Sequence, residues 1–588
     1  MVEWSRVGWS RSRHWARGRS AAQAAVHHLL SQAHSTARPF ALRLPFLFIA
    51  PTQVQNVMRR TSSLVAALIL LPSLLGLPSR ASETPPLYPP VDHLHVEDGR
   101  IVDTQGRKVL LRGVNVNQLG DYFQGNPEVP ATMPFSRRDV ERIAALGSNV
   151  VRLLVHWSAL EPEPGVYDDE YIDQIHQAVT WCRSAGLSVV LDMHQDAWGK
   201  YIASDPDGTC IRPLFGPNIG WDGAPEWATY TLGMARCAFL GIRELSPAVM
   251  AAWHNFWGDR DAIQQHLIDT WAVLAAEFRD DSTVIGYDLI NEPNVGFRYF
   301  VTLMQNRPDF YAALTEAIRD AEAGGLTKIV FYEPFALWSA IPLEPAFRWT
   351  EDTQIIFAPH IYLGALGPGL PLPDDGRRLL SFSFWEARRE SRRLGTTFWV
   401  GEWGWFRGPS DYTRHFARLE DEYQVGSAFW QWKQACGDPH GVSWPLGGVP
   451  AESGNLVVVR CGDPTFPEGV EIGLHEDNAL LLSRPYPRRF PGDAEFESDV
   501  DGRRLSMWGE VDLPAAPIEV WVPGEAAPVE SWDEESINVS QRTPVEGGWI
   551  YELLPATESW SFEITGQDGA RPAWVLGPDP ETPGVNPR

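Results

Sequence analysis

Short apolar runs alternate with amphipathic helical segments over most of this chain of 588 residues. Eight runs have the β-branched and aromatic composition of buried strands, and most are followed by a helical segment. These runs are residues 108–116, 149–155, 187–195, 283–293, 327–334, 353–362, 396–404 and 425–432. Repeated strand–helix units predict a (β/α)₈ TIM barrel. An open doubly wound sheet would need a nucleotide-binding loop, and neither glycine-rich motif of that kind occurs.

The pattern changes after residue 488. Short alternating runs divided by Pro and Gly predict a small C-terminal β-sandwich over residues 492–566. The final segment, residues 567–588, is rich in Pro and Gly and predicts a disordered tail. The catalytic barrel is therefore expected over residues 88–488.

The N-terminal part has the order of a signal peptide. Residues 58–81 contain two arginines, an apolar run and small residues around Ala81. The run is too short to span a bilayer, and no Cys follows the cleavage site to carry a lipid, so no stable membrane anchor is expected. Residues 1–57 show no clear period and are interpreted as a mis-called start. A secreted or periplasmic protein is the resulting prediction.

Charge narrows the choice of partner. The formal net charge is −26, even though residues 1–80 are basic. Such an acidic body disfavours nucleic acid or an anionic membrane surface as an electrostatic partner, and it suits a neutral substrate better. Aromatic residues make up 11% of the chain, which fits either large cores or platforms that stack on rings.

Five cysteines fit an exported protein. Cys210 and Cys237 bracket one loop-like insertion, Cys436 and Cys461 bracket another, and Cys182 lies in a helical pattern. Two disulfides and one buried thiol are predicted, with merely buried cysteines as the alternative. Because no CxxC pair and no Cys/His cluster at metal spacing occurs, neither a metal nor another cofactor is expected.

Polar or indole side chains stand at the ends of all eight predicted strands. They are Asn115, Asn117, Arg152, His156, His194, Asp196, Asn291, Glu292, Glu333, His360, Tyr362, Glu402, Trp430 and Trp432. Active sites of barrels lie at the carboxyl ends of the strands, so Glu292 and Glu402 would face each other across the mouth. Paired carboxylates suit hydrolysis of a glycosidic bond. For either one alone, a solvated acid is the ordinary alternative.

These residues resemble glycoside hydrolase family 5, whose catalytic glutamates follow strands four and seven. The matching positions are the motif NEP at 291–293 together with Glu402, Arg152, His194, His360 and Tyr362. The resemblance spans roughly residues 90 to 490. Within the family, the segments at 192–199, 222–229, 430–436 and 483–488 are similar to endoglycoceramidases, which release the glycan from the ceramide of glycosphingolipids.

The resemblance implies a role for each matching residue. Glu292 would be the acid/base and Glu402 the nucleophile of a retaining enzyme. Asn291 would hold the sugar's 2-hydroxyl, His360 and Tyr362 would orient Glu402, and Arg152 would keep it ionised. Further substrate contacts are expected from His194, Asp196, Trp227, Lys433 and one of Trp430 and Trp432.

Two regions leave the substrate open. The loop after the first strand offers Asn117, Gln118 and Asp121 where endoglycoceramidases carry a lysine. The insertion after the third strand, which includes Leu240 and Met250, predicts a lipid-accepting groove or a helical cap. The expected substrate is a neutral glycan or glycolipid, with transient contact to lipid surfaces. Alternatives are an exo-acting β-glucosidase on glucosylceramide or steryl glucoside, a β-glucanase or mannanase, and a non-catalytic carbohydrate-binding protein.

Overall fold

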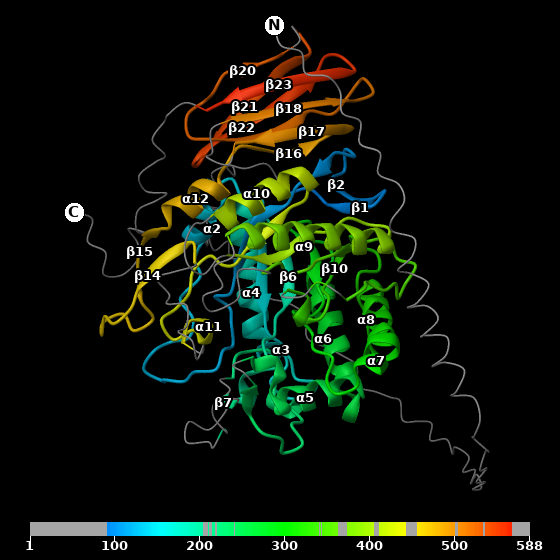
Figure 1. The fold of residues 1–588 in the computed structure, drawn as a ribbon, viewed down its shortest axis with the longest axis vertical. Helices are drawn as coiled ribbons and strands as arrows, with labels where there is room; N and C mark the ends of the chain where they lie inside the picture. The colour runs from blue at the N-terminus through cyan, green and yellow to red at the C-terminus, as the bar shows by residue number, and fades with distance from the viewer. Residues whose placement is uncertain are drawn as a thin grey trace, which may run out of the picture. The chain divides into compact units, whose positions relative to one another are not determined.

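The computed structural model describes residues 91–566, except 204–209, 211–214, 218–219, 240–241, 340–341, 343, 363–372, 405–410, 443–454, 500–503 and 533–534 (Figure 1). The predicted start, the predicted signal peptide, the predicted tail and Leu240 lie outside these residues. Within the described part, no helix is both long and apolar enough to cross a bilayer.

An eight-stranded parallel sheet forms the centre of the fold. Its strands are β4 (Arg112–Val116), β5 (Val150–Val155), β6 (Ser188–Met193), β9 (Val284–Asp288), β10 (Ile329–Tyr332), β11 (Ile355–Phe357), β12 (Val400–Trp403) and β13 (Ser427–Phe429). They run in the order β11-β10-β9-β6-β5-β4-β13-β12. A parallel bridge between Phe357 and Phe398 links the two ends of this order. The predicted parallel strands are confirmed, and the curled sheet is consistent with a TIM barrel.

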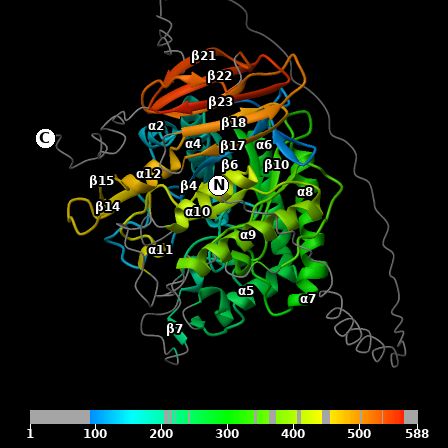
Figure 2. The ribbon, with the colours of Figure 1, turned by 45° about the horizontal axis from the view of Figure 1, so that its top comes forward.

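Helices cover the outside of this sheet (Figures 1 and 2). The longer ones are α2 (Arg137–Ala145), α4 (Asp169–Ser184), α6 (Ile263–Phe278), α8 (Arg307–Ala321), α9 (Pro373–Leu394) and α10 (Asp411–Tyr423), and shorter ones are α3 (Trp157–Leu160), α11 (Pro439–Val442) and α12 (Glu476–Leu482). Ser136 caps α2, because its hydroxyl accepts from the amide of Asp139. Strands β5, β6 and β9 are buried along their whole length, as sheets covered on both faces require.

The insertion after β6 forms helix α5 (Pro247–Trp257). The side chains of Trp253, Phe256 and Trp257 are at most 2% exposed and belong to the main hydrophobic core. Because a lipid-accepting groove needs exposed apolar side chains, this burial favours the helical cap over the groove.

The chain also forms two larger antiparallel sheets, whose strands come from before and after the curled sheet in the sequence. One has the order β1-β2-β3-β16-β19-β22-β21 and the other β17-β18-β23-β20. Their bounds are β1 (His95–Glu97), β2 (Arg100–Val102), β3 (Lys108–Val109), β16 (Tyr486–Phe490), β17 (Asp493–Ser498), β18 (Arg504–Glu510), β19 (Ile518–Pro523), β20 (Val529–Glu530), β21 (Ile537–Val545), β22 (Gly548–Pro555) and β23 (Ser559–Thr565). Buried side chains from both sheets, among them Met507, Trp521 and Phe562, share one hydrophobic cluster. The first three strands of the described chain thus extend a C-terminal sheet.

Both predicted disulfides are present. Cys210 is bonded to Cys237, Cys436 is bonded to Cys461, and Cys182 is a buried free thiol. The first bridge ties the short ribbon of β7 (Phe215–Pro217) and β8 (Cys237–Phe239), and the second adjoins the ribbon of β14 (Val457–Arg460) and β15 (Val470–Leu474). Each bridge fastens a loop that extends from the carboxyl side of a barrel-type strand.

Candidate active site

Arg152 lies at the centre of the polar cluster at the carboxyl ends of the strands. It projects from β5 and is fully buried. Its guanidinium donates to Glu402 Oε1 at 2.8 Å, to Asn291 Oδ1 at 2.9 Å and to Glu333 Oε1 at 2.7 Å. Burial alone would lower the pKa of Arg152, but the surrounding carboxylates, led by Asp192, raise it well above its usual range. A permanent cation is therefore fixed among the carboxylates.

Glu402 accepts two hydrogen bonds inside this cluster. Arg152 holds one oxygen, and the hydroxyl of Tyr362 donates to Oε2 at 3.1 Å. The side chain lies in β12 and is only 5% exposed. Donors on both oxygens, one of them an arginine, therefore fix the orientation of this carboxyl group.

Glu292 follows β9 in a different environment. Its φ of +37° lies in the left-handed region, which costs a non-glycine residue about 1 kcal/mol or more. Its amide donates to Glu333 Oε2 at 2.8 Å, and Gln195 Nε2 donates to its carbonyl at 2.9 Å. These two bonds hold the strained backbone. Burial raises the pKa of Glu292 to about 7, aided by the charge of Glu402 and opposed by His360.

His360 lies between the two glutamates. Its Nδ1 is 2.9 Å from Glu292 Oε1 and 3.4 Å from Glu402 Oε2, while its Nε2 is 3.3 Å from Glu333 Oε2. Burial alone would lower the pKa of His360, but Glu333 and Glu402 raise it well above its usual value. One carboxyl oxygen of Glu292 and one of Glu402 lie within 4.8 Å of each other and of a ring nitrogen of His360. The pair therefore combines a carboxyl group that titrates near neutrality with an ion-paired carboxylate.

His194 and Asp196 lie beside this pair, in the loop after β6. His194 Nδ1 is 2.7 Å from Asp192 Oδ2, and Asp196 Oδ1 pairs with Arg243 at 2.6 Å. Asp196 Oδ2 is 3.0 Å from His440 Nε2. Burial opposes both shifts, yet Arg243 holds the pKa of Asp196 well below its usual range, and Asp438 raises that of His440 to about 9.

The sequence did not indicate Arg243 or His440. Arg243 belongs to the insertion after β6, in a 3₁₀ turn (Arg243–Leu245), and His440 belongs to α11 beyond β13. Neither residue directly follows a predicted strand, so neither was among the candidate residues at the strand ends. The phrase CGDPH at 436–440, with a carboxylate two residues before the histidine, is the signal that was available for His440.

The structure distinguishes the two tryptophans that follow β13. The ring of Trp430 stacks on His194 with centroids 5.5 Å apart and lies 5.0 Å from His440. Trp432 is fully buried, and its Nε1 donates to Asp139 of α2 at 2.9 Å. Trp430 is therefore the tryptophan of the polar cluster.

Lys433 is also directed away from the glutamates. Its Nζ contacts Asp139 Oδ1 at 2.8 Å and Glu471 Oε1 at 3.0 Å, and the residue is 3% exposed. A buried ammonium group between two carboxylates is held by its structural partners. The geometry does not support the expected substrate contacts of Trp432 and Lys433.

Trp227 lies outside the cluster as well. Its Nε1 donates to the carbonyl of Glu161 at 3.1 Å, and its ring meets Trp157 and His266 edge-on, with centroids 5.4 and 4.7 Å apart. The ring is partly exposed. These contacts place it between α3 and α6 and not against the two glutamates.

The loop after β4 is tied to neighbouring loops. Asn117 donates to Asp438 Oδ2 at 3.0 Å, and Gln118 donates to the carbonyl of Lys433 at 2.7 Å. Asp121 pairs with Lys200 at 2.6 Å. The lysine that contacts the loop after β4 is therefore Lys200, which belongs to the segment after β6.

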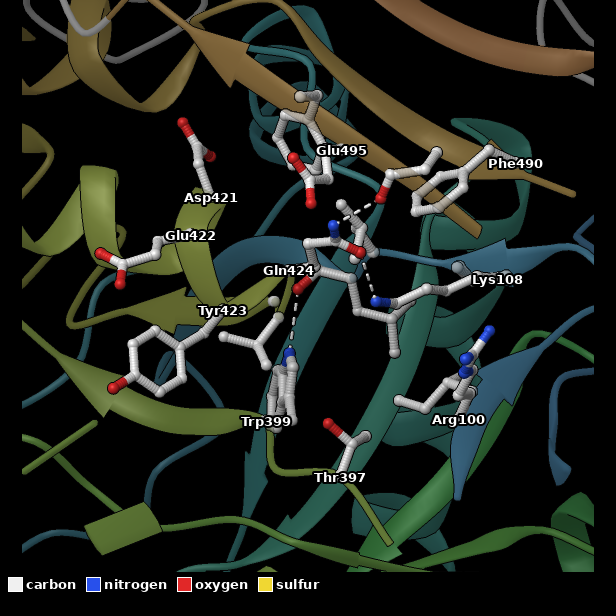
Figure 3. A pocket seen from close by; sticks show the side chains of 18 of the residues that line it. Arg100, Lys108, Thr397, Trp399, Asp421, Glu422, Tyr423, Gln424, Phe490 and Glu495 are labelled. Carbon is white, nitrogen blue, oxygen red and sulfur yellow. Dashed lines mark hydrogen bonds between the residues drawn. The ribbon is translucent and has the colours of Figure 1, made fainter. Parts of the chain in front are cut away.

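A separate cavity of about 1050 Å³ is lined by none of Arg152, Glu292 and Glu402, and Figure 3 shows part of its lining. Its lining includes Trp399 and Gly426, which directly precede β12 and β13 and so mark the amino ends of the strands. Lys108 Nζ donates to Gln424 Oε1 at 2.9 Å, and Gln424 Nε2 donates to the carbonyl of Ala494 at 2.6 Å. Since the cavity opens at the amino ends, it is distinct from the candidate active site.

Comparison with known proteins decides the family. The model of the cellulase family, described as glycosyl hydrolase family 5, matches residues 102–436. The chain belongs to glycosyl hydrolase family 5. This member of the family is a glycosidase, an enzyme that hydrolyses glycosidic bonds.

Three relatives illustrate where the family 5 chain lies among known proteins. It is 29% identical to endoglycoceramidase I of Rhodococcus hoagii (strain 103S) over 363 residues, which cover 58% of this chain and 68% of that protein. The crystal structure of an endogalactoceramidase is 40% identical, with a TM-score of 0.71, and the match covers 81% of this chain and all of the other. Endo-glycoceramidase II from Rhodococcus sp., in a cellobiose-like imidazole complex, is 25% identical with a TM-score of 0.59, covering 79% and 99%.

Proposed function

We propose that this enzyme is a retaining β-glycosidase in which Glu292 is the acid/base and Glu402 the nucleophile. The observation that carries the proposal is the approach of the two carboxyl groups, whose nearest oxygens lie within 4.8 Å. Retaining glycosidases hold their carboxyl groups about 5–5.5 Å apart, whereas inverting enzymes leave room for a water molecule at about 6.5–9.5 Å.

In the first step, a carboxylate oxygen of Glu402 attacks the anomeric carbon while Glu292 gives its proton to the glycosidic oxygen. The bond between that carbon and that oxygen breaks, and the aglycone leaves as an alcohol. Arg152 and Tyr362 keep Glu402 ionised and oriented. With a pKa of about 7, Glu292 carries its proton at neutral and acidic pH.

In the second step, Glu292 is a carboxylate and takes a proton from water. The water oxygen attacks the anomeric carbon and expels Glu402, so the sugar leaves with its original configuration. We expect Asn291 to contact the 2-hydroxyl, and the hydrogen bonds of its amide with Arg152 and with the carbonyl of Gln195 would hold the side chain in one orientation. His194, Asp196 and Trp430 offer further contacts to the sugar, through hydrogen bonds and ring stacking.

A glycosphingolipid is the proposed substrate. Two of the relatives described above are endoglycoceramidases, and a third is an endogalactoceramidase. Their names join a sugar to ceramide, which supports a substrate with a glycan and a lipid aglycone. The proposed cleavage is at the bond to ceramide, which releases the glycan intact.

Exposed apolar side chains that follow Glu292 along the chain, together with Leu337, support a lipid aglycone, and we call this group the patch. It consists of Phe297, Tyr299, Phe300, Val301, Met304 and Leu337. Phe300 is 77% exposed and Met304 is 76% exposed, in the helical turns α7 (Tyr299–Val301) and Thr302–Asn306. The amide of Ala336, beside Leu337, donates to the carbonyl of Pro293 at 2.9 Å, which joins the patch to the loop of Glu292. Clustered exposed apolar side chains of this kind mark lipid or protein contact sites.

Product analysis tests the substrate. The protein is incubated separately with a ganglioside, with glucosylceramide and with a soluble β-glucan, and the products are identified by mass spectrometry. Free ceramide together with an intact oligosaccharide from the ganglioside is the expected result. Release of glucose from glucosylceramide, with the ganglioside left intact, would assign exo action instead. Cleavage of the β-glucan alone would refute the glycolipid substrate, and a Glu402→Gln protein is the control for contaminating activity.

We propose the finer architecture and the location on related grounds. The bridge between Phe357 and Phe398 supports a closed (β/α)₈ barrel over residues 88–488, and the shared cluster of the two antiparallel sheets supports a β-sandwich over residues 492–566.

Two disulfides fit an oxidising compartment, and hence export after removal of residues 58–81. The exported protein should begin near Ser82, which N-terminal sequencing tests. Retention of Met1 would refute export.

A further inference from the structure

Three potential ligand atoms converge beside the catalytic pair, and none of them takes part in the proton transfers or the nucleophilic attack of the proposed hydrolysis. They are His194 Nε2, His440 Nε2 and Asp196 Oδ2, and all lie within 4.8 Å of one another. The aspartate oxygen is 3.0 Å from His440 Nε2 and 3.7 Å from His194 Nε2. Ligands about 2.0–2.1 Å from a tetrahedral ion lie about 3.4 Å apart, a value between these two distances.

The far side of each histidine is held by a carboxylate. Asp192 Oδ2 is 2.7 Å from His194 Nδ1, and Asp438 Oδ1 is 2.7 Å from His440 Nδ1. Carboxylates in this position orient metal-bound histidines and fix the ring nitrogen that faces the metal. Asp438 is itself held, because Asn117 donates to its second oxygen at 3.0 Å. The two rings are therefore oriented with Nε2 toward the common point.

His194 Nε2 supplies an independent sign of a ligand. The residue is 1% exposed, and this nitrogen has no hydrogen-bond partner among the described residues. A buried ring nitrogen without a partner costs free energy unless something binds it. The nitrogen faces the carboxylates of Asp196 and Asp222, at 3.7 and 3.9 Å.

We propose that His194, Asp196 and His440 bind a divalent transition-metal ion such as Zn²⁺. Two imidazoles and one carboxylate are a ligand set that Zn²⁺ accepts, with one position left for water. Arg243 pairs with Oδ1 of Asp196, and Oδ2 is hydrogen-bonded to His440 Nε2 at 3.0 Å, a bond that the ion would replace. Each imidazole must lose any proton on Nε2 before that nitrogen can bind the ion, so binding should weaken at low pH.

The site adjoins the place where the sugar is proposed to bind. Trp430 stacks on His194 and also lies against His440, and the metal would use atoms of His194 and Asp196 that are proposed to contact sugar hydroxyls. Zn²⁺ and substrate are therefore expected to compete. The metal site rests on the geometry of the three side chains and does not depend on the identity of the glycolipid.

Calorimetric titration of the full chain with ZnCl₂ tests the proposal. The wild-type protein should bind one ion at this site, and His440→Ala should weaken that binding by at least about 100-fold, since it removes a ligand. Asp438→Asn keeps all three ligands and removes only the carboxylate behind His440, so it should weaken binding by about 10- to 100-fold. His176→Ala is the matched control, because His176 pairs with Glu277 on the outside of the fold and should not affect binding.

X-ray absorption at the zinc edge gives a readout that does not involve catalysis. The spectrum of the loaded wild type should contain scattering from two imidazoles. His440→Gln keeps most of the packing, and near-ultraviolet circular dichroism verifies that each variant is folded. Unchanged zinc affinity in folded His440→Ala or His440→Gln would place the ion at other histidines and overturn the proposal. A wild-type protein that binds no zinc would overturn it as well.

Discussion

Replacing His360 by Gln removes the positive charge that lies beside Glu292 and keeps a side chain that can donate a hydrogen bond to it. Glu292 must be protonated to act as the acid in the first step, so kcat/KM should fall above its pKa, which is about 7. His360 lowers that pKa through its charge and its 2.9 Å hydrogen bond. Without the charge, the pKa of Glu292 rises and the alkaline decline of activity moves to higher pH.

The structure sets the size of this shift. A hydrogen bond to a charged group contributes about 1.5–3 kcal/mol, and a neutral one contributes about 1 kcal/mol. Their difference is about 0.5–2 kcal/mol, and each pKa unit corresponds to about 1.4 kcal/mol. The alkaline midpoint of the His360→Gln protein is therefore expected about 0.4 to 1.5 pH units above that of the wild type.

The assay is kcat/KM against pH for a glycoside with a poor leaving group, for which protonation by the acid limits the rate. Tyr362→Phe is the control, because its hydroxyl donates to Glu402, and its alkaline midpoint should remain near that of the wild type. Both variants lose absolute rate, but the position of the midpoint does not depend on that loss. A midpoint for His360→Gln that is unchanged or lower would refute the electrostatic account of Glu292.

Three further outcomes are expected. With an activated aryl glycoside and azide, Glu292→Ala should yield the β-glycosyl azide and Glu402→Ala the α-azide, as read by NMR; the opposite pattern would reverse the two roles. Cys436→Ser should lower the free energy of unfolding by about 3 kcal/mol, measured with urea, and an unchanged midpoint would show that the bridge adds no stability. Phe300→Ser with Met304→Ser should reduce kcat/KM on glycolipid vesicles at least about 10-fold more than on a soluble aryl glycoside, because exposed apolar side chains contribute to lipid contact; equal losses would separate the patch from substrate binding.

The positions of the parallel strands were predictable from the sequence. Strands buried on both faces are apolar throughout, so β5 at 150–155 falls within the predicted run 149–155, and β9 at 284–288 falls within 283–293. The alternation of strands and helices then predicted parallel order. Strands β1 and β2 were not predicted, since three residues show no period, and the predicted run 108–116 proved to be two strands, β3 and β4, in different sheets.

Glu292, Glu402 and Arg152 were proposed as site residues because each lies in or shortly after a buried parallel strand, and the carboxyl ends of such strands form the active sites of barrels. The sequence left open which of Trp430 and Trp432 lies in the polar cluster, and it did not show that Lys433 points away from the cluster, because β13 ends at Phe429 and beyond that point no strand period fixes the direction of a side chain. Asp139, the partner of Trp432 and Lys433, lies on α2, a contact between segments that no local pattern of the sequence contains.

The pairing of β3 with β16 affects how the chain can be made. Arg489 pairs with Val109, so roughly 380 residues separate the partners, and a ribosome adding about 5–20 residues per second needs about 20 to 80 s to connect them. During that time one edge of β3 is open for pairing with other chains. A shortened chain that ends before β16 would keep this edge open permanently. The first strands of the described chain therefore gain their sheet partner only after β16 has been synthesised, so a nascent chain needs its C-terminal part before β3 is fully paired.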